Sequence, residues 1–141
     1  MSGSIMTKVV LDTNVLVSAL IKAGKPRELL LEIVRGDAQL ILSRGILEEL
    51  AEVTADDKIG RYVEEEDIAK FLRIVSGTAK IVSIKSRFKA VKNDPSDDLF
   101  LRTAYDGGAD YIVSGDKHLL SLKEFKGIKI LTVNEALDLL L

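Results

Sequence analysis

Short apolar runs alternate along this chain with longer segments whose apolar residues recur at helical spacing, and no other feature restricts the fold as much. The run at residues 9–11 (VVL) is typical of a buried strand, whereas Ile68 and Leu72 fall on one face of a helix. Strands that alternate with helices are joined by crossovers. The order therefore predicts an α/β fold with three layers, in which a mostly parallel central sheet carries helices on both faces.

The predicted strands cover residues 8–11, 39–42, 80–84, 109–113 and 128–131. The predicted helices cover residues 15–23, 26–35, 44–50, 64–75, 97–105 and 134–140, with a short one around Leu119. Ser43 and Ser96 precede two of these helices and are predicted to cap them. The polar stretch 54–62 is predicted to be a connection without a helix, and residues 85–95 a loop.

Length and composition limit the class of protein. The chain has 141 residues, so we expect residues 1–141 to form a single domain, with residues 1–5 a disordered or non-native leader. The absence of Cys excludes disulfides and thiolate metal sites and suits a cytoplasmic protein. The net charge of −2 excludes a general basic coat for nucleic acid. No apolar run approaches the ~20 residues of a membrane helix, so we expect no membrane partner.

Two aspartates lie at the carboxyl ends of predicted strands. Asp12 ends the first strand, and Asp116 follows the strand at 109–113. Ligand sites in open α/β sheets lie at the carboxyl ends of the strands, so both side chains are candidates for one site. Each also has a structural alternative, because an Asp at a strand end can simply cap the helix that follows.

Further acids are predicted at helix starts. Asp97 and Asp98 fall in the first turn of one helix, and Glu48 and Glu49 lie near the start of another. Taken singly, the first pair could serve only the helix dipole and the second pair could be solvated. Together with Asp12 and Asp116, they would form an anionic cluster that needs a cation. Mg²⁺ or Mn²⁺ bound there could activate a water and neutralise a phosphodiester, which is nuclease chemistry.

Four segments resemble the motifs of PIN-domain nucleases, in the family's order. They are residues 9–14 (VVLDTN), 43–50 (SRGILEEL), 94–101 (DPSDDLFL) and 108–116 (GADYIVSGD). The resemblance covers essentially the whole chain and is closest to the VapC-type toxins of prokaryotic toxin–antitoxin pairs. It implies a PIN-like fold and a Mg²⁺- or Mn²⁺-dependent endoribonuclease.

The resemblance also implies site residues. The acids that match the family's metal ligands and catalytic positions are Asp12, Glu49, Asp98 and Asp116, with Asp97 as an additional metal ligand. Glu48 could replace Glu49, and Asp97 could replace Asp98, by a slip of one residue. Asn14 and Ser114 match positions that orient carboxylates or water. His118 stands where many relatives carry an acid, and we expect no catalytic role for it.

Partners follow from the same resemblance and from the charges. RNA would be the substrate, a small antitoxin a possible partner, and a homodimer the expected assembly. Lys85, Arg87, Lys89 and Lys92 precede the third segment and could steer RNA, or could be a solvated loop. The apolar C-terminus could pack on the core or join a subunit interface.

Three other functions compete with the toxin reading. A housekeeping RNA-processing nuclease and a non-catalytic PIN-like RNA-binding protein share the fold. A receiver-like phosphoacceptor domain also has an acidic pocket at strand ends, but it needs a supporting Lys that has no convincing counterpart here.

Overall fold

The computed structural model describes residues 6–89 and 95–140, and for Pro95 and Ser96 it describes the backbone alone. The expectations for the leader at residues 1–5, for Lys92 and for capping by the Ser96 side chain lie outside the described residues.

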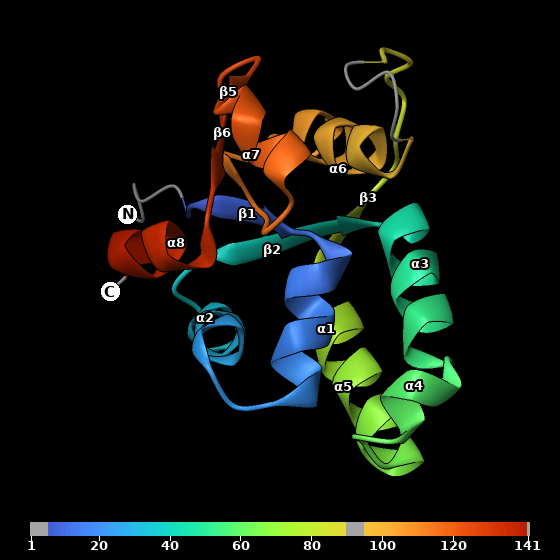
Figure 1. Cartoon of the computed structure of the whole chain (residues 1–141). Helices are drawn as coiled ribbons and strands as arrows, with labels where there is room; N and C mark the ends of the chain where they lie inside the picture. Colours follow the sequence, from blue (N-terminus) through green and yellow to red (C-terminus); the bar gives the residue numbers. More distant parts are fainter. Residues whose placement is uncertain (1–5, 90–94, 141) are drawn as a thin grey trace.

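One twisted sheet runs through the middle of the molecule (Figure 1). Its strands are β1 (Lys8–Leu11), β2 (Gln39–Ser43), β3 (Lys80–Val82), β4 (Tyr111–Val113), β5 (Glu124–Phe125) and β6 (Ile128–Leu131). They lie side by side in the order β3-β2-β1-β4-β6-β5, and every neighbouring pair is parallel except β5 with β6. The prediction of a mostly parallel sheet is confirmed.

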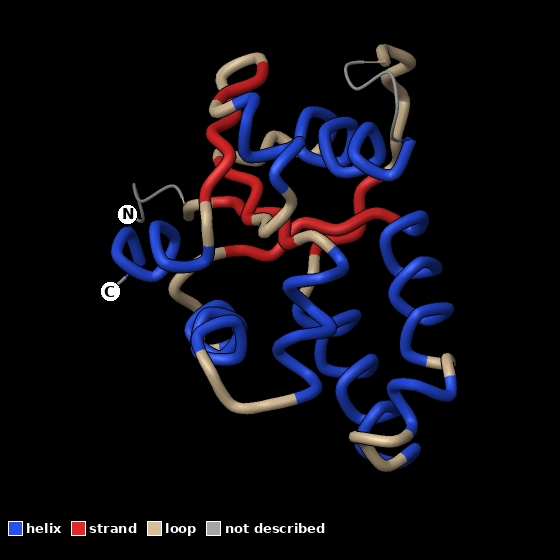
Figure 2. Tube along the Cα trace, viewed as in Figure 1, coloured by secondary structure: helices blue, strands red, loops and turns tan. Residues whose placement is uncertain are grey.

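Helices cover both faces of this sheet (Figures 1 and 2). They are α1 (Thr13–Ile21), α2 (Lys25–Val34), α3 (Arg44–Thr54), α4 (Asp57–Gly60), α5 (Glu65–Thr78), α6 (Pro95–Asp106), α7 (Lys117–Leu122) and α8 (Val133–Leu140). Helices α6 and α7 lie on one face, and α1, α2 and α5 lie on the other, so the three-layer arrangement is also confirmed.

The central strands are buried on both sides, which explains their unbroken apolar sequences. Val10 and Leu11 of β1 and Ile112 and Val113 of β4 are fully buried. Strands covered by helices on both faces have no solvent side, so they lack the alternation of polar and apolar residues seen in half-exposed sheets. These strands form the rigid floor of the site described below.

The C-terminal helix α8 packs against α2 and β6. Its Ala136 and Leu137 join the core, while Leu139 is half exposed. Leu141 lies outside the described residues. Within the described part of the chain, no helix combines the length and the apolar character needed to cross a membrane.

Three local predictions were wrong. The stretch 54–62 contains the short helix α4, which Asp56 caps by accepting a hydrogen bond from the Lys58 amide. Strand β5 was missed because its two residues form only the edge of a hairpin that turns at Lys126 and Gly127, both with positive φ. Ser43 precedes α3 but makes no side-chain cap, because its hydroxyl pairs with that of Thr103 on α6 at 2.8 Å.

The strand order reverses beside β1. From β1 the chain crosses on one face to β2 and β3, and then returns through α6 on the other face to β4 on the opposite side of β1. The loops that leave β1 and β4 therefore diverge to opposite faces, which opens a crevice at the carboxyl ends of these two strands.

Candidate active site

Asp12 stands at this crevice, where β1 ends and α1 begins. Its backbone is extended, and its Oδ1 accepts a hydrogen bond from the Val15 amide at 2.8 Å, so it is the N-cap of α1. Its backbone amide donates to the Val113 carbonyl of β4 at 3.1 Å. The structural role of a cap is therefore real, and it fixes the carboxylate beside the end of β4.

Ser114 joins the two strand ends through its side chain. The buried Ser114 hydroxyl donates to Asp12 Oδ2 and accepts a hydrogen bond from the Asp116 amide at 2.9 Å. Asp116 in turn caps α7, since its Oδ1 accepts from the His118 amide at 2.7 Å. One hydroxyl thus ties together two acids that are 104 positions apart in the sequence (116 − 12 = 104).

Helix α3 supplies the third acid. Glu49 is half buried and faces the crevice, whereas the exposed Glu48 forms an ion pair with Arg44, with 2.9 Å between Glu48 Oε1 and Arg44 Nε. Gly45 lets α3 approach α6 closely, because a Cβ there would lie 2.9 Å from a methyl group of Leu99. Of the two glutamates, the structure brings Glu49 to the site.

Helix α6 supplies the fourth acid from its first turn. Asp97 and Asp98 are both buried, at 2% and 5% exposure. Asp97 lines the pocket between the helix starts, and Asp98 is not among the residues that line it. Asp97 is therefore the better placed of the pair, and ligation by Asp98 stays a prediction.

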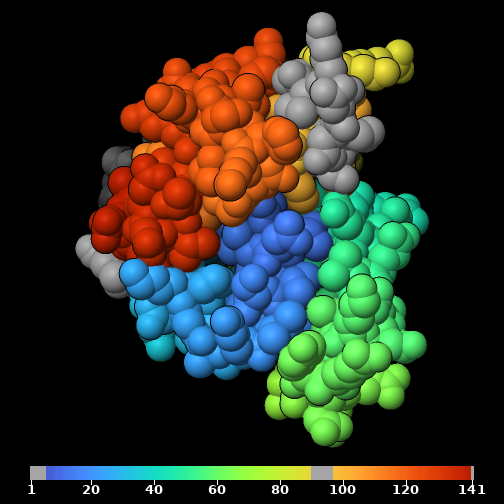
Figure 3. Space-filling view, viewed as in Figure 1, coloured from blue at the N-terminus to red at the C-terminus, as the bar shows by residue number. Residues whose placement is uncertain are grey.

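These side chains surround one pocket of about 190 Å³. Six of the seven residues that line it are polar, and the full set is Asp12, Thr13, Asn14, Glu49, Asp97, Phe100 and Asp116. Figure 3 shows the segments that form the mouth, with α1 in blue, α3 in teal and α7 in orange adjoining on one face of the molecule. The acids come from four separate parts of the chain, so only the fold brings them together.

The environment of Asp12 is electrostatically unfavourable for its charge. Burial raises the pKa of Asp12, and the charge of Asp116 adds to this rise. Hydrogen bonds from Ser114, Val15 and Gly115 oppose it but do not cancel it. Carboxylates that repel one another in a buried pocket are stabilised by a cation, which lowers the cost of ionising them all.

The donor set suits a hard divalent cation that keeps part of its water. Among the described residues, no three acidic or His side chains stand close enough together to hold an ion by themselves. Mg²⁺ commonly binds through only one or two carboxylates and retains several waters. A pocket of about 190 Å³ has room for such waters, which take roughly 30 Å³ each, and its lining offers oxygen ligands.

Sequence reasoning missed two residues of the pocket. Thr13 is buried, and its hydroxyl has no hydrogen-bond partner within the described part of the chain. Phe100 forms an apolar wall one helical turn beyond Asp97. The available signals were that Thr13 follows Asp12 directly and that Phe100 lies three residues after Asp97 on the same helix. Thr and Phe at such positions usually contribute only to packing, so neither signal was specific.

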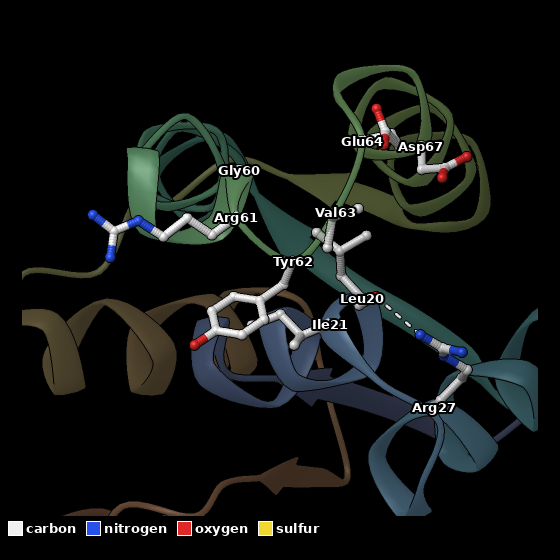
Figure 4. Close-up of a pocket in the computed structure, with 9 residues that line it drawn as sticks. All are labelled: Leu20, Ile21, Arg27, Gly60, Arg61, Tyr62, Val63, Glu64 and Asp67. Carbon is white, nitrogen blue, oxygen red and sulfur yellow. Dashed lines mark hydrogen bonds between the residues drawn. The ribbon is translucent and has the colours of Figure 1, made fainter.

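Larger hollows lie elsewhere on the molecule. One of about 380 Å³ opens between the end of α1 and the turn from α4 to α5 (Figure 4). There the Arg27 guanidinium donates to the backbone carbonyls of Ala19 and Leu20, and the exposed Tyr62 forms part of the rim. The guanidinium of Arg27 is therefore committed to closing the end of α1.

The predicted basic residues and His118 lie outside the pocket, whereas Asn14 lies at its mouth. Lys85, Arg87 and Lys89 are exposed on the segment between β3 and α6, and none lines the acidic pocket. His118 is exposed and contributes its backbone amide to the Asp116 cap. Asn14 is exposed at the pocket mouth.

Comparisons with known proteins agree with this architecture. A family model described as the PIN domain matches residues 8–118. The uncharacterized protein MJ1680 of Methanocaldococcus jannaschii is 36% identical over 129 residues, which cover 89% of this chain and 82% of that protein.

Two solved structures share the fold at low sequence identity. PAE2754 from Pyrobaculum aerophilum has a TM-score of 0.68 at 15% identity, covering 99% of this chain and 93% of its own. VapBC2 from Rickettsia felis, solved with a DNA fragment from their promoter, has a TM-score of 0.59 at 15% identity, covering 89% of this chain and 98% of the matched chain.

Proposed function

Since the chain belongs to the PIN-domain family, whose members are in general nucleases, we propose that it is an endoribonuclease that requires Mg²⁺ or Mn²⁺. The observation that carries this proposal is that Asp12, Glu49, Asp97 and Asp116 line one pocket. Four acids from distant segments would destabilise an ordinary surface pocket, but they suit one that binds a cation and a phosphate.

Each side chain has a distinct part in the proposed site. Asp12, Glu49, Asp97 and Asp116 would hold the cation, one or two of them directly and the others through its bound waters, and the cation when bound would acidify a water and offset charge on the phosphate. Ser114 keeps Asp12 and Asp116 in register through its two hydrogen bonds. Asn14, at the mouth, is placed to orient a phosphate oxygen or a water.

The first test is cleavage of a labelled single-stranded RNA with Mg²⁺, Mn²⁺ or EDTA, beside DNA of the same sequence. We expect cleavage of the RNA only with metal, and its abolition by Asp12→Asn without loss of the fold. Full activity of that variant, or equal activity in EDTA, would overturn the proposal. Cleavage of DNA alone would keep the nuclease and refute the ribonuclease.

The paired acids provide matched controls. Glu49→Gln should reduce cleavage at least tenfold, whereas Glu48→Gln removes the same charge outside the pocket and should leave it unchanged. Asp97→Asn should impair cleavage more than Asp98→Asn. The opposite order would assign the ligand to Asp98.

We further propose that the chain is the toxin of a toxin–antitoxin pair and acts as a homodimer inhibited by a small partner protein. The fold shared with VapBC2 of Rickettsia felis supports this role. Induced expression of the chain should arrest growth, expression of the Asp12→Asn variant should not, and a small protein encoded beside it should relieve the arrest. Growth without arrest would favour a housekeeping role in RNA processing.

A further inference from the structure

A segment between β3 and α6 presents its cations in a regular row. Along residues 84–89 the exposed residues Lys85, Arg87 and Lys89 alternate with half-buried Ile84, Ser86 and Phe88. This alternation is that of an extended chain, in which every second side chain points the same way, about 7 Å apart. Three positive charges therefore line the outer side of one segment.

Hydrogen bonds from helix α6 hold this segment in place. Asp106 Oδ2 accepts from the Lys85 amide at 3.0 Å, the Ser86 amide at 3.1 Å and the Ser86 hydroxyl at 2.7 Å. Partial burial raises the pKa of Asp106, but these hydrogen bonds outweigh that effect and lower the pKa. One turn earlier on α6, the Arg102 Nε donates to the Phe88 carbonyl at 2.8 Å.

The two anchors also give the segment a direction. Because Ser86 is held at Asp106 and Phe88 at Arg102, the segment runs along α6 toward its N-terminal end. The anchors are separated by about 6 Å of helix, and Asp97 lies about 7.5 Å beyond Arg102 at 1.5 Å per residue. The row of cations thus leads toward the end of α6 that carries the acidic pocket.

Aromatic rings fix the centre of the segment. The Phe88 ring contacts Tyr105 edge to face at 5.6 Å and Phe125 at 5.1 Å between centroids. Lys126, at the tip of the β5–β6 hairpin, places its Nζ 5.6–5.8 Å from all three centroids. Tyr105 stays half exposed although Phe88 and Lys126 contact its ring, so the rest of its side chain is accessible to a ligand.

We infer that residues 85–89, together with Tyr105, form a binding tract for the backbone and bases of single-stranded RNA, laid along α6 toward the acidic pocket. Cations at regular intervals beside an exposed aromatic ring are what single-strand binding requires, because phosphates need charge and unpaired bases need a surface to stack on. The inference that this tract binds RNA rests on the proposed ribonuclease function. It also supplies the attraction for phosphate that four carboxylates and a net charge of −2 do not.

The test is binding of a short fluorescent oligouridylate in EDTA, where no metal-dependent cleavage occurs, over a range of salt concentrations. Replacing Lys85, Arg87 and Lys89 together by Gln should weaken binding about tenfold or more. The slope of log affinity against log salt should fall by about 2, because each phosphate contact on a single strand contributes about 0.7. Tyr105→Ala should weaken binding about tenfold, and Tyr105→Phe should not.

A matched control removes the same charge elsewhere. Lys22, Lys58 and Arg73 are exposed on other parts of the molecule, and replacing all three by Gln should leave the salt slope nearly unchanged. An equal loss in both triple variants would overturn the tract, as would an unchanged slope in the first. Equally tight binding of a duplex, with the same dependence on these residues, would overturn its preference for single strands.

The outcome is separable from that of the nuclease proposal. A chain that binds oligouridylate through the tract but never cleaves RNA would refute the nuclease and leave the tract. A chain that cleaves RNA while the first triple variant behaves as wild type would refute the tract and leave the nuclease. Thermal unfolding of every variant would show whether a loss of binding reflects a loss of fold.

Discussion

The substitution Asp116→Asn separates the role of Asp116 as a helix cap from its proposed role as a metal ligand. Asp116 caps α7 through Oδ1, and an amide oxygen can accept the same hydrogen bond from His118. The substitution removes repulsion against Asp12 but weakens the favourable interaction with the helix dipole, two effects of roughly 0.3–1 kcal/mol each and of opposite sign. In EDTA the free energy of unfolding should therefore change by less than about 0.7 kcal/mol.

With metal the two proteins should diverge. For 141 residues, an unfolding entropy of about 2.1 cal/mol/K per residue makes 1 kcal/mol equivalent to about 3 °C in Tm. At Mn²⁺ 100-fold above its Kd, the wild type gains about 2.7 kcal/mol, or about 9 °C. A variant that binds the ion tenfold more weakly gains about 1.4 kcal/mol, or about 5 °C.

Thermal unfolding in EDTA and across an Mn²⁺ titration measures both effects. Asp116→Ala should lose the cap and about 1 kcal/mol even in EDTA, and Glu48→Gln should shift with Mn²⁺ as the wild type does. Identical Mn²⁺ shifts in wild type and Asp116→Asn would refute a role of Asp116 in binding the ion. A loss above 1 kcal/mol in EDTA for Asp116→Asn would refute the balance of cap and repulsion.

Three further predictions concern buried groups of the fold. Thr13→Val keeps the side-chain shape and removes a buried hydroxyl that has no hydrogen-bond partner in the described part of the chain. The Tm of the metal-free protein should therefore rise by about 3 °C, and a lower Tm would contradict this prediction. Gly107→Ala would place a Cβ 2.5 Å from Ile41 Cγ2 and 2.9 Å from the Thr103 carbonyl oxygen, so it should cost about 2 kcal/mol in urea unfolding, and an unchanged midpoint would disprove the close contact. Because the pKa of Asp12 is raised, the folded metal-free protein holds this proton more tightly than the unfolded chain. This stabilisation is complete below the ordinary Asp pKa of about 3.9 and is lost as pH rises through the raised pKa of Asp12. Over that pH window the free energy of unfolding of the wild type should therefore fall relative to that of Asp12→Asn. A difference between the two proteins that stays constant with pH would contradict the raised pKa.

Local sequence patterns were sufficient to predict that Asp12 and Asp116 lie at the carboxyl ends of strands. Buried strands leave unbroken apolar runs, and the polar residue that ends each run marks the carboxyl edge of the sheet. The lateral order of strands leaves no such mark. In the structure β4 lies beside β1. This pairing places the Ser114 hydroxyl within hydrogen-bonding distance of Asp12, which is 102 positions away in the sequence.

Where tertiary contacts compete with local signals, prediction from sequence failed. Ser43 stands at a cap position, but the close packing of α6 on β2 gives its hydroxyl a better partner in Thr103. The choice between Asp97 and Asp98 was open for a different reason. One residue turns a helix by about 100°, so the position at which α6 starts decides which acid faces the pocket, and helix boundaries are the least certain part of a sequence reading.

The cap role of Asp12 and Asp116 and their proposed role as metal ligands, which compete when the sequence is read alone, are compatible in the structure. An N-cap hydrogen bond uses one acceptor position on a carboxylate oxygen, and a carboxylate has about four. Capping thus fixes the direction of Asp12 and Asp116 and still leaves acceptor positions for an ion. The helix starts that need these caps also carry partial positive charge, which lowers the cost of gathering carboxylates before a cation binds. Helix N-termini therefore hold Asp12 and Asp116 in place without metal, so metal binding in the proposed site would not have to order these two acids.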